Sequence, residues 1–424
     1  MSKLLFRRYI IPTIPRSLLL LPALMTAGAA AVLMLGSTGP RPAPPEPPTP
    51  EPADAGTRPA ASAPATEPAP VSEAEDPRRG LTLTFLGDIM AHTVNVDTED
   101  YRRIYEDVRE ELIADDLTFA NLETPVVPDR PYRSFPRFNV RPEYVEAAAE
   151  AGVDVLSVAN NHATDQGVEG VEATRSVLEE LGESYGIVYN GTRTEPAESP
   201  EVTVIEKGGR RIGFVAAVAV LNYPEDGEEL VQTVSYHDEA EAGRFIEWVE
   251  EQAGEFDLFV ISYHGGEEYA REPEPAKVRF FERLVAAGAD IVWSHHPHVL
   301  QRWRMIRGAD GGDALILHST GNFISGQTWR LDPSEVDSPR AATGDGALFR
   351  VTLGWDDEGR LSLGHDPIPI TNYRHPHHGM VVRRYDELPD GEMNEAWKRY
   401  YVLRRNAVQE LIWRSWTDRT LHEP

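Results

Sequence analysis

Five short apolar runs of this 424-residue chain each end in residues that can bind a metal ion or move a proton. The residues that follow the runs are Gly87-Asp88, Asn121-Leu122-Glu123, Asn160-Asn161-His162-Ala163-Thr164-Asp165, His264-Gly265-Gly266-Glu267-Glu268 and His295-His296-Pro297-His298. Imidazole and carboxylate groups are ligands that Mn, Fe, Zn and Co accept. These residue types therefore favour the chemistry of a divalent transition-metal site.

Each motif taken alone also has an ordinary structural interpretation. An Asp at a strand end often caps a helix, and an Asn pair often belongs to a turn. His264 alone is equally compatible with a packed and a functional side chain. The run that contains His296 and His298 is the strongest single motif, because alternate residues of an extended chain can address one point.

The residue types also indicate what such a metal site could do. Two divalent ions about 3.5–4 Å apart can bind a phosphoryl oxygen, generate a hydroxide nucleophile and balance the charge on a leaving oxygen. A neighbouring histidine can donate the proton that the leaving group needs. The chain has no cysteine, so thiolate ligands, disulfides and a thiol nucleophile are excluded. His, Asn, Asp and Glu must supply every ligand.

The elements that must position these residues are those of an α/β domain. We expect strands at 81–86, 117–120, 153–159, 212–220, 258–263, 291–294 and 314–318. Apolar residues at helical spacing predict helices over 168–181 and 278–288, the second ending at a glycine. In an open α/β sheet the loops at the carboxyl ends of strands gather at one edge. The five motifs should therefore meet there.

Four segments follow one another along the chain. Residues 1–36 combine a basic flank with an uncharged 18-residue apolar span, which predicts a transmembrane signal-anchor, or alternatively a cleaved signal peptide. Residues 37–79 are rich in Pro, Ala and Glu and predict a disordered linker. We expect residues 80–384 to form the folded domain that carries the five motifs. Residues 385–424 predict a C-terminal helix, packed on the domain or lying at a membrane surface. The basic flank should stay in the cytoplasm, which places the domain outside the membrane.

The charge balance narrows the class of partner. The chain has 69 acidic and 41 basic residues, a net charge of −28, and −27 of it belongs to residues 78–424. Proteins that bind nucleic acids neutralise phosphates with Lys and Arg, so this field has the wrong sign. We expect no nucleic-acid partner.

Six segments resemble, in order, the motifs of the CapA-type poly-γ-glutamate capsule biosynthesis proteins. These segments are 84–90, 121–125, 157–167, 264–269, 288–298 and 319–323. The resemblance spans about 81–383 and implies the calcineurin-like metallophosphoesterase fold, a β-sandwich flanked by helices. It also agrees with an outward-facing domain on an amino-terminal membrane anchor.

The resemblance implies roles for individual residues. Glu123 would bridge two ions, Asp88 and His298 would bind the first, and Asn161, His264 and His296 would bind the second. His162 would be the general acid, and Asp165 would hold its other ring nitrogen. Asn121, Asn160, Glu268, His295 and Asn322 would line the substrate site. The metals implied are two divalent ions of Mn, Fe or Zn.

Two positions depart from the broader phosphoesterase pattern. Met90 stands where those enzymes place a histidine two residues after the first Asp, and His92 lies two residues further on. Glu123 stands where they bridge with Asp. The first ion should therefore bind more weakly, and a one-metal or non-hydrolytic site is an alternative.

Two functions of different classes follow. The first is a metal-dependent hydrolase that acts on a phosphoester or an anionic capsule polymer outside the membrane, beside membrane-bound capsule synthase subunits. The second is a non-hydrolytic scaffold or export subunit that binds polymer or a synthase. The histidine group at 375–378 predicts a solvated loop after the last strand, and 356–359 predicts a hairpin turn.

Overall fold

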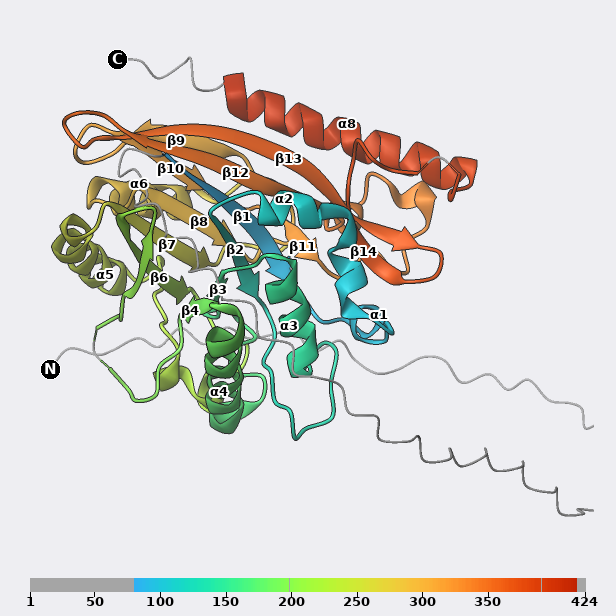
Figure 1. Ribbon diagram of the computed structural model, residues 1–424, viewed down its shortest axis with the longest axis horizontal. Coiled ribbons are helices and arrows are strands. Elements are labelled where there is room, and N and C mark those ends of the chain that lie inside the picture. Colours follow the sequence, from blue (N-terminus) through green and yellow to red (C-terminus); the bar gives the residue numbers. More distant parts are fainter. Residues whose placement is uncertain (1–79, 198, 390, 418–424) are drawn as a thin grey trace, which may run out of the picture. The chain divides into compact units, whose positions relative to one another are not determined.

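Two β-sheets face each other in the computed structural model of the protein, which describes residues 80–197, 199–389 and 391–417 (Figure 1). The first sheet has the order β14-β13-β12-β1-β2-β3-β4, and β11 also pairs with β1. Its strands are β1 Leu81–Ile89, β2 Leu117–Leu122, β3 Val155–Ser157, β4 Val188–Asn190, β11 Asn322–Ile324, β12 Asp345–Trp355, β13 Leu361–His375 and β14 Gly379–Arg384. The strands β1 to β4 are parallel, and β12 to β14 extend the sheet in antiparallel fashion.

The second sheet has the order β5-β6-β7-β8-β10-β9. Its strands are β5 Thr203–Lys207, β6 Arg210–Val218, β7 Leu258–His264, β8 Ile291–His295, β9 Trp303–Arg307 and β10 Asp313–Leu317. The four central strands are parallel, and the two edge strands are antiparallel to their neighbours. Both sheets therefore present the carboxyl ends of parallel strands.

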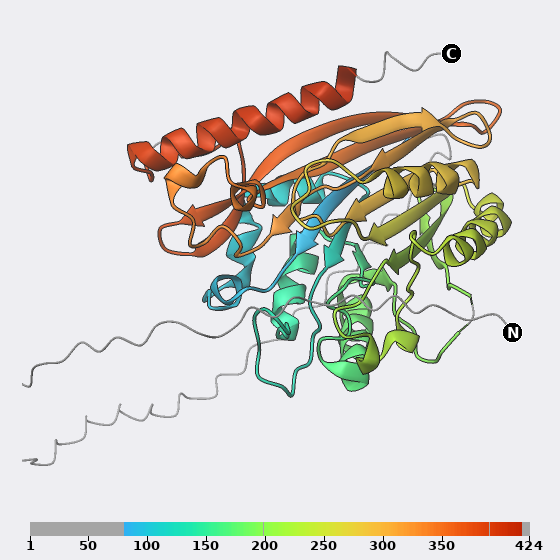
Figure 2. The same ribbon diagram turned by 180° about the vertical axis from the view of Figure 1, so that it is seen from behind.

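Helices cover the outer faces of the two sheets (Figures 1 and 2). They are α1 Thr93–Val96, α2 Arg109–Ile113, α3 Pro142–Ala151, α4 Gly167–Tyr185, α5 Glu239–Gln252, α6 Pro275–Ala286, α7 Pro339–Ala342 and α8 Glu395–Thr417. The helices α3 and α4 bury their apolar faces against the first sheet, and α5 and α6 bury theirs against the second. The result is four layers, helix, sheet, sheet and helix.

Aromatic side chains fill the space between the two sheets. Phe85 and Phe119 of the first sheet stack with ring centroids 4.8 Å apart, and Phe214 and Trp293 of the second contact them edge-on or tilted. These parallel strands are covered on both faces of their sheet. Successive side chains are therefore buried, and the sequence of each strand is a continuous apolar run. This buried core holds the two carboxyl edges close together.

The structure contains each of the seven predicted strands, as β1, β2, β3, β6, β7, β8 and β10, and both predicted helices, as α4 and α6. It distributes the strands over two sheets instead of one open sheet, in agreement with the sandwich that the resemblance implied. Gly288 follows α6 with a positive φ of 112°, as a helix-ending glycine should.

The C-terminal segment differs in its boundary. The chain from 379 to 384 forms β14, and α8 begins at Glu395, ten residues after the predicted start at 385. Pro389 and Gly391 lie in the intervening segment, and both residue types disfavour a helix interior. Tyr400, Tyr401 and Val408 of α8 are buried on the domain, which confirms the packed helix. The membrane-surface alternative stays a prediction.

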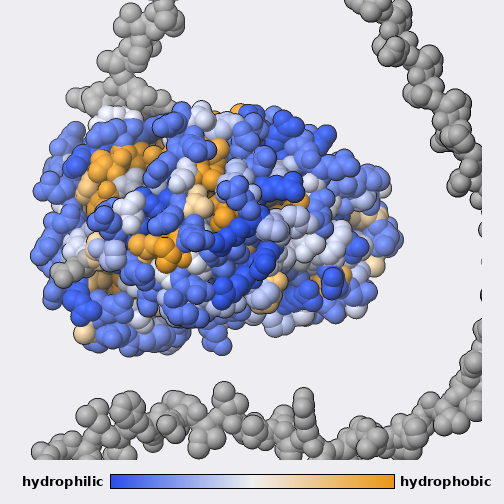
Figure 3. All heavy atoms as spheres, turned by 90° about the horizontal axis from the view of Figure 1, so that it is seen from below, coloured by the Kyte–Doolittle hydropathy of each residue, from blue (hydrophilic) through white to orange (hydrophobic). Residues whose placement is uncertain are grey.

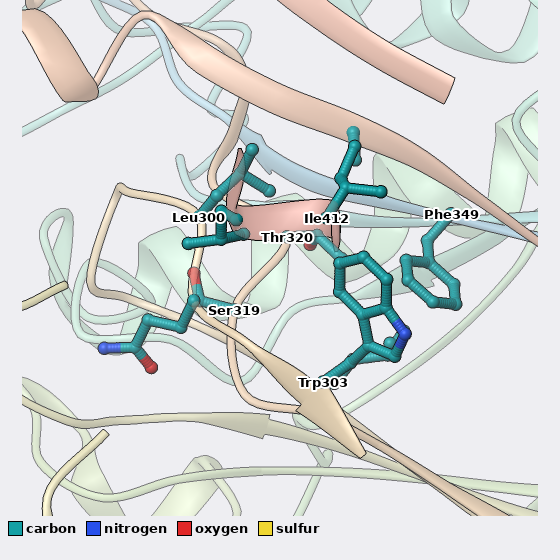
Figure 4. Close-up of a pocket in the computed structure, with 10 residues that line it drawn as sticks. Leu300, Trp303, Ser319, Thr320, Phe349 and Ile412 are labelled. Atoms are coloured by element: carbon teal, nitrogen blue, oxygen red, sulfur yellow. The ribbon is translucent and has the colours of Figure 1, made fainter. Parts of the chain in front are cut away.

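The contact between α8 and the sheets is tight. Leu411 and Ile412 close over Leu300, Trp303 and Phe349, and the remaining cavity is about 10 Å³ (Figure 4). A cavity of that size has room for at most one water molecule. This contact is therefore a packing seam and not a ligand site.

The two remaining sequence features are loops. Asp356–Gly359 forms the predicted hairpin turn between β12 and β13, closed by the Gly359 N–H to the Asp356 carbonyl at 3.0 Å. The histidines at 375–378 form the turn that joins β13 to β14, so the prediction that they follow the last strand was wrong. The predicted signal-anchor (1–36) and linker (37–79) lie outside the described residues. Within the described ranges, no helix combines the length and the hydropathy needed to span a bilayer.

Candidate metal centre

Strand register brings the sequence motifs to one place. Asp88 of β1 is in register with Asn121 of β2 and with Asn322 of β11. In the facing sheet, His264 of β7 is in register with His295 of β8. The Trp293 indole N–H donates to the Leu86 carbonyl at 2.9 Å, which ties the two sheets together directly behind the site.

Gly87 allows the close approach that aims Asp88 into the site. A Cβ atom at residue 87 would lie 1.8 Å from the Gly321 carbonyl oxygen, so any other residue would push the loop away. The Asp88 N–H donates to that same carbonyl at 3.2 Å, and the β1–β2 register shifts between Phe85 and Asp88. A local irregularity of this kind re-aims a side chain at a strand end.

The first group of polar side chains surrounds Asp88, which is fully buried. Its Oδ1 accepts from the Asn121 amide at 2.8 Å, and its Oδ2 lies 3.0 Å from His298 Nδ1. His298 Nδ1 also lies 3.1 Å from Asn322 Oδ1. The hydrogen bond and charge interaction with His298 hold the pKa of Asp88 below its usual value, although burial opposes this shift.

The second group surrounds His264. Its Nε2 lies 2.8 Å from Asn161 Oδ1 and 3.0 Å from His296 Nδ1. Its Nδ1 lies 2.7 Å from His295 Nδ1. Burial lowers the pKa of His264 well below its ordinary value and lowers the pKa of both His295 and His296 to about 3. These imidazoles are therefore neutral, with lone pairs available for a metal ion.

Glu123 lies between the two groups. Its Oε1 is buried and has no hydrogen-bond partner, yet it lies 3.8 Å from His298 Nε2, 3.9 Å from His264 Nε2 and 4.0 Å from His162 Nε2. Burial and the nearby Asp88 carboxylate raise the pKa of Glu123 well above its usual range. Two buried carboxylates this close repel each other unless a cation or a proton lies between them.

The donor set fits a divalent cation. Asp88, His264 and His295 offer ligand atoms that lie within 4.8 Å of one another, and so do Glu123, His296 and His298. All six side chains are buried. The unpartnered Glu123 oxygen between the imidazoles is the atom that a bound ion would satisfy.

His162 and Asp165 form a hydrogen-bonded pair at the edge of this cluster. His162 Nδ1 lies 2.7 Å from Asp165 Oδ2, and the same carboxylate oxygen accepts the Phe138 N–H at 2.6 Å. The Phe138 ring packs edge-on against the imidazole with centroids 4.6 Å apart. These contacts fix the ring so that Nε2 faces Glu123.

The backbone around the imidazoles is in a region that residues other than glycine rarely adopt. His296 has φ of 98°, His298 has φ of 57° and Tyr269, on the facing loop, has φ of 65°. Such conformations cost about 1–3 kcal/mol each and persist where the surrounding structure imposes them. Three such residues around one cluster indicate that the positions of the side chains, and not the backbone preferences of the residues, determine the conformation of these loops.

Most of the predicted site residues do come together, with some differences in position. His295 was expected to line the substrate site, but it is fully buried behind His264, with Nε2 2.8 Å from the Ser262 hydroxyl. Asn160 donates to the Leu122 carbonyl at 2.7 Å and holds the loop. Glu268 is exposed on the loop after β7 and acts on Glu123 only through its charge.

Met90 and His92 lie outside the ligand cluster. Met90 is buried in the core of the first sheet. His92 precedes α1, and its Nδ1 accepts the Gly326 N–H at 3.2 Å. Neither side chain belongs to a group that could hold an ion among the described residues.

Asn222 is a site residue that the sequence analysis missed. Its Oδ1 accepts from the Asn161 amide, and its Nδ2 lies 3.4 Å from His162 Nδ1. It follows β6, so the rule that polar residues at strand ends converge would have found it.

Two facing sheets, outer helices and a buried cluster of imidazoles, carboxylates and amides at their carboxyl edges are features of a metallophosphoesterase-like protein. A model of the bacterial capsule synthesis protein family PGA_cap matches residues 82–327. The chain belongs to this family. That match includes every residue of the cluster.

Individual proteins are similar to this chain over shorter or longer segments. The capsule biosynthesis protein CapA of Bacillus anthracis is 30% identical over 62% of this chain and 63% of its own length. The PGA biosynthesis protein CapA of Bacillus subtilis is 27% identical over 68% of this chain and 72% of its own length. A hypothetical protein of Thermus thermophilus with a solved structure gives a TM-score of 0.38 at 19% identity, over 68% of this chain and 99% of that one.

Proposed function

We propose that this protein is a divalent-metal-dependent hydrolase of the phosphoesterase type that acts in the synthesis of a poly-γ-glutamate capsule. The observation that carries the proposal is the Glu123 carboxyl group, buried with an unpartnered oxygen among imidazoles and close to a second buried carboxylate, Asp88. Burying two carboxyl groups together without a Lys or Arg partner destabilises a fold, and a bound cation would remove that cost.

The assignment of ligands is the one that the resemblance implies, and the short distances between these side chains support it. Asp88 and His298 would hold one ion, Asn161, His264 and His296 would hold the other, and Glu123 would contact both. His295 would orient His264 from behind, because a second hydrogen-bonded shell fixes the direction of a ligand. When bound, Mn, Fe or Zn supplies Lewis acidity toward a phosphoryl oxygen and lowers the pKa of water.

The remaining residues act on the substrate side of the cluster. His162 presents Nε2 to the same space that Glu123 Oε1 faces, and it can donate a proton from that nitrogen to the leaving oxygen. Asp165 accepts from Nδ1 and keeps the ring in this orientation. Asn222 and Asn161 limit how far the ring can tilt.

The cellular setting is part of the proposal. Relatives carry the names capsule biosynthesis protein and PGA biosynthesis protein, which supports a role for this chain beside membrane-bound synthase subunits. The basic and apolar residues of the segment 1–36 support a single-pass anchor with the domain outside the cytoplasm. The substrate would be the anionic polymer or a phosphoester intermediate.

A second candidate is a scaffold or export subunit without hydrolytic activity. The observation in its favour is that Met90 is buried in the core, so the first ion lacks a histidine that phosphoesterases place there. A site that holds one ion in place of two would bind substrate without efficient turnover.

Metal content and turnover separate the two candidates. The full chain is purified from cells supplied with Mn, Fe and Zn, and bound metal is counted beside hydrolysis of bis-p-nitrophenyl phosphate. Two equivalents of metal with turnover that Asp88→Asn abolishes support the hydrolase. One equivalent or less, with intact ester, supports the scaffold.

A further inference from the structure

An arginine-rich loop interrupts the acidic character of this chain. Residues 129–141, between β2 and α3, contain four arginines and one aspartate, a net charge of +3 in a protein whose net charge is −28. This loop begins six residues after Glu123 in the chain and lies beside the amino-terminal end of α4 (Figure 1). A local excess of positive charge in an otherwise acidic protein favours the approach of anions.

Three of these arginines line one pocket. The pocket has a volume of about 440 Å³ and is lined by Arg130, Pro131, Arg133, Arg137, Asp165, Gln166, Gly167 and Asp226. Asp165 belongs to both places, because its carboxylate holds His162 while the residue also lines the pocket. An anionic group in the pocket would therefore lie one residue away from the proposed general acid.

Two of the arginines are held in place by the protein. Arg137 donates to Asp226 Oδ2 at 2.9 Å, and its guanidinium carbon lies 3.6 Å from the centroid of the Tyr223 ring. Arg130 donates to the Gln166 carbonyl at 2.6 Å and pairs with Glu169, whose side chain is 83% exposed. These contacts pre-orient both guanidinium groups, which reduces the entropy that binding would cost.

Arg133 is different because its side chain is free while its backbone is fixed. Its N–H and carbonyl exchange two hydrogen bonds with Asn139, both 2.9 Å long. Its side chain is exposed and forms no ion pair with any residue that the structure describes. An unpaired guanidinium on a rigid backbone is a ready donor pair for a carboxylate or a phosphate.

Aromatic residues accompany the arginines on the same loop. Phe135 is 68% exposed and Tyr132 is 38% exposed, although the domain buries most of its large apolar side chains. The surface of the domain seen from below is largely hydrophilic, with hydrophobic patches between the hydrophilic residues (Figure 3). Charged and apolar contacts together suit a ligand that alternates carboxylates with methylene groups.

We propose that the pocket formed by Arg130, Arg133 and Arg137 binds an oxyanion of the substrate, either a free α-carboxylate of a γ-linked glutamate chain or a phosphate. The pocket guides the substrate past His162 into the metal centre. This role rests on the proposed hydrolase for its purpose, but the binding itself requires no turnover. The acidic remainder of the domain repels the polymer, so binding concentrates at this loop.

The test measures binding of a fluorescent γ-glutamate oligomer to the full chain by anisotropy, with metal bound and with metal removed by chelation. Arg133→Gln should weaken binding about five- to tenfold, because one charge-assisted contact is lost. Arg133→Lys should restore part of the affinity. The matched control is Arg279→Gln on α6, an exposed arginine that also removes one positive charge and should change affinity less than twofold.

Competition identifies the oxyanion. Inorganic phosphate that displaces the oligomer from the wild type, and does so less well from Arg133→Gln, assigns a phosphate subsite. Displacement by glutarate but not by phosphate assigns a carboxylate subsite. Raising the salt concentration should weaken binding less in Arg133→Gln than in the wild type, because fewer charges are paired.

The outcomes separate this inference from the proposed hydrolase. Equal affinities of wild type, Arg133→Gln and the double variant Arg130→Gln/Arg133→Gln, in a protein that still hydrolyses bis-p-nitrophenyl phosphate, would overturn the subsite alone. An equal loss in Arg279→Gln would also overturn it, since the effect would then be one of net charge. Loss of affinity in Arg133→Gln without any turnover in the wild type would support the subsite and remove the hydrolase.

Discussion

Two buried clusters of charged side chains in the described part of the chain differ in whether they contain their own cation. Near α8, the Asp345 carboxylate is paired with Arg404, and its Oδ1 also accepts from the Tyr385 hydroxyl at 2.5 Å. At the metal centre, Asp88 and Glu123 are equally buried, but no Lys or Arg side chain of the described residues is paired with either of them. The two clusters are buried to a similar extent. The carboxylate near α8 has a cationic side chain as its partner, and the described residues supply none for Asp88 and Glu123.

The difference shows what each cluster is for. A buried ion pair with every oxygen satisfied fixes one arrangement of the chain, here the position of α8 on the sheets. A buried group of acceptors with an unpartnered oxygen is complete only when a cation arrives from outside. We therefore expect changes at Asp345 and Arg404 to alter stability and changes at Asp88 and Glu123 to alter metal binding and activity.

The largest expected effect is on activity at the metal centre. Asp88→Asn and Glu123→Gln should each lower turnover of a phosphodiester at least about 10³-fold, since a lost ion removes several kcal/mol of transition-state stabilisation. The chelated form of Glu123→Gln should unfold in urea at the same or a higher concentration than the chelated wild type, whereas Asp88→Asn should lose a little stability because Asp88 already contacts Asn121 and His298. A large loss of stability in the metal-free variants would contradict the view that this cluster is incomplete without metal.

The opposite pattern is expected near α8. Arg404→Met should lower the free energy of unfolding by about 3 kcal/mol, because it leaves Asp345 buried without its cation. Metal content should stay at the wild-type value. Arg399→Met, at an exposed position of the same helix, is the matched control and should change stability by less than about 0.5 kcal/mol.

A third comparison adds the missing cation instead of removing a side chain. Mn²⁺ at a hundred times its dissociation constant should stabilise the wild type by about 2.7 kcal/mol, as measured by urea unfolding. Glu123→Gln should lose most of this increment, and Arg404→Met should keep all of it. Equal stabilisation of all three proteins would place the ion somewhere other than this centre.

Strand-end motifs predicted which residues would cluster far better than they predicted where each side chain lies within the cluster. Asp88, Glu123 and His264 each follow an apolar run, and parallel strands bring such ends together whatever the order of the sheets. His295 also follows a strand, but alternation along β8 buries it behind His264, which residue type alone does not reveal. The spread of seven expected strands over two sheets depended on long-range pairing, which local patterns do not encode.

The second cluster could not have been predicted from the sequence. Arg404 lies at helical spacing from Tyr400 and Val408, which places it on the buried face of its helix, but nothing near it in the chain identifies its partner. Its partner Asp345 lies 59 residues away at the start of β12. Only the docking of α8 brings the two together, so the pair is a product of tertiary structure.

The incomplete cluster should also make the metal-free protein sensitive to pH. Burial and the Asp88 carboxylate raise the pKa of Glu123 well above its ordinary value of 4.5. Below pH 4.5 the Glu123 carboxyl is protonated in both the folded and the unfolded state. Between pH 4.5 and the raised pKa it is protonated in the folded state only. The Glu123 carboxyl should therefore contribute a loss of stability of up to about 1.4 kcal/mol per pH unit as the pH rises through this range. The buried histidines oppose this contribution, because their lowered pKa makes the folded state bind fewer protons than the unfolded state.

Urea unfolding of the chelated wild type and of Glu123→Gln between pH 5 and 7 measures this slope. The variant carries no titrating group at residue 123, so the stability of the wild type relative to that of the variant should fall as the pH rises. Identical slopes would show that the Glu123 carboxyl has released its proton in the folded protein.

The smallest expected effect concerns a residue at the rim of the metal centre. Asp165→Asn should lower kcat about tenfold, or about 1.4 kcal/mol, because it weakens the hydrogen bond that orients His162. The asparagine oxygen can still accept the Phe138 N–H, so the fold and the metal content should be unchanged. The loss should be larger for a methyl phosphodiester than for a nitrophenyl ester, since only the poorer leaving group needs the proton from His162. Equal losses with the two esters would mean that Asp165 supports the loop and has no part in proton transfer.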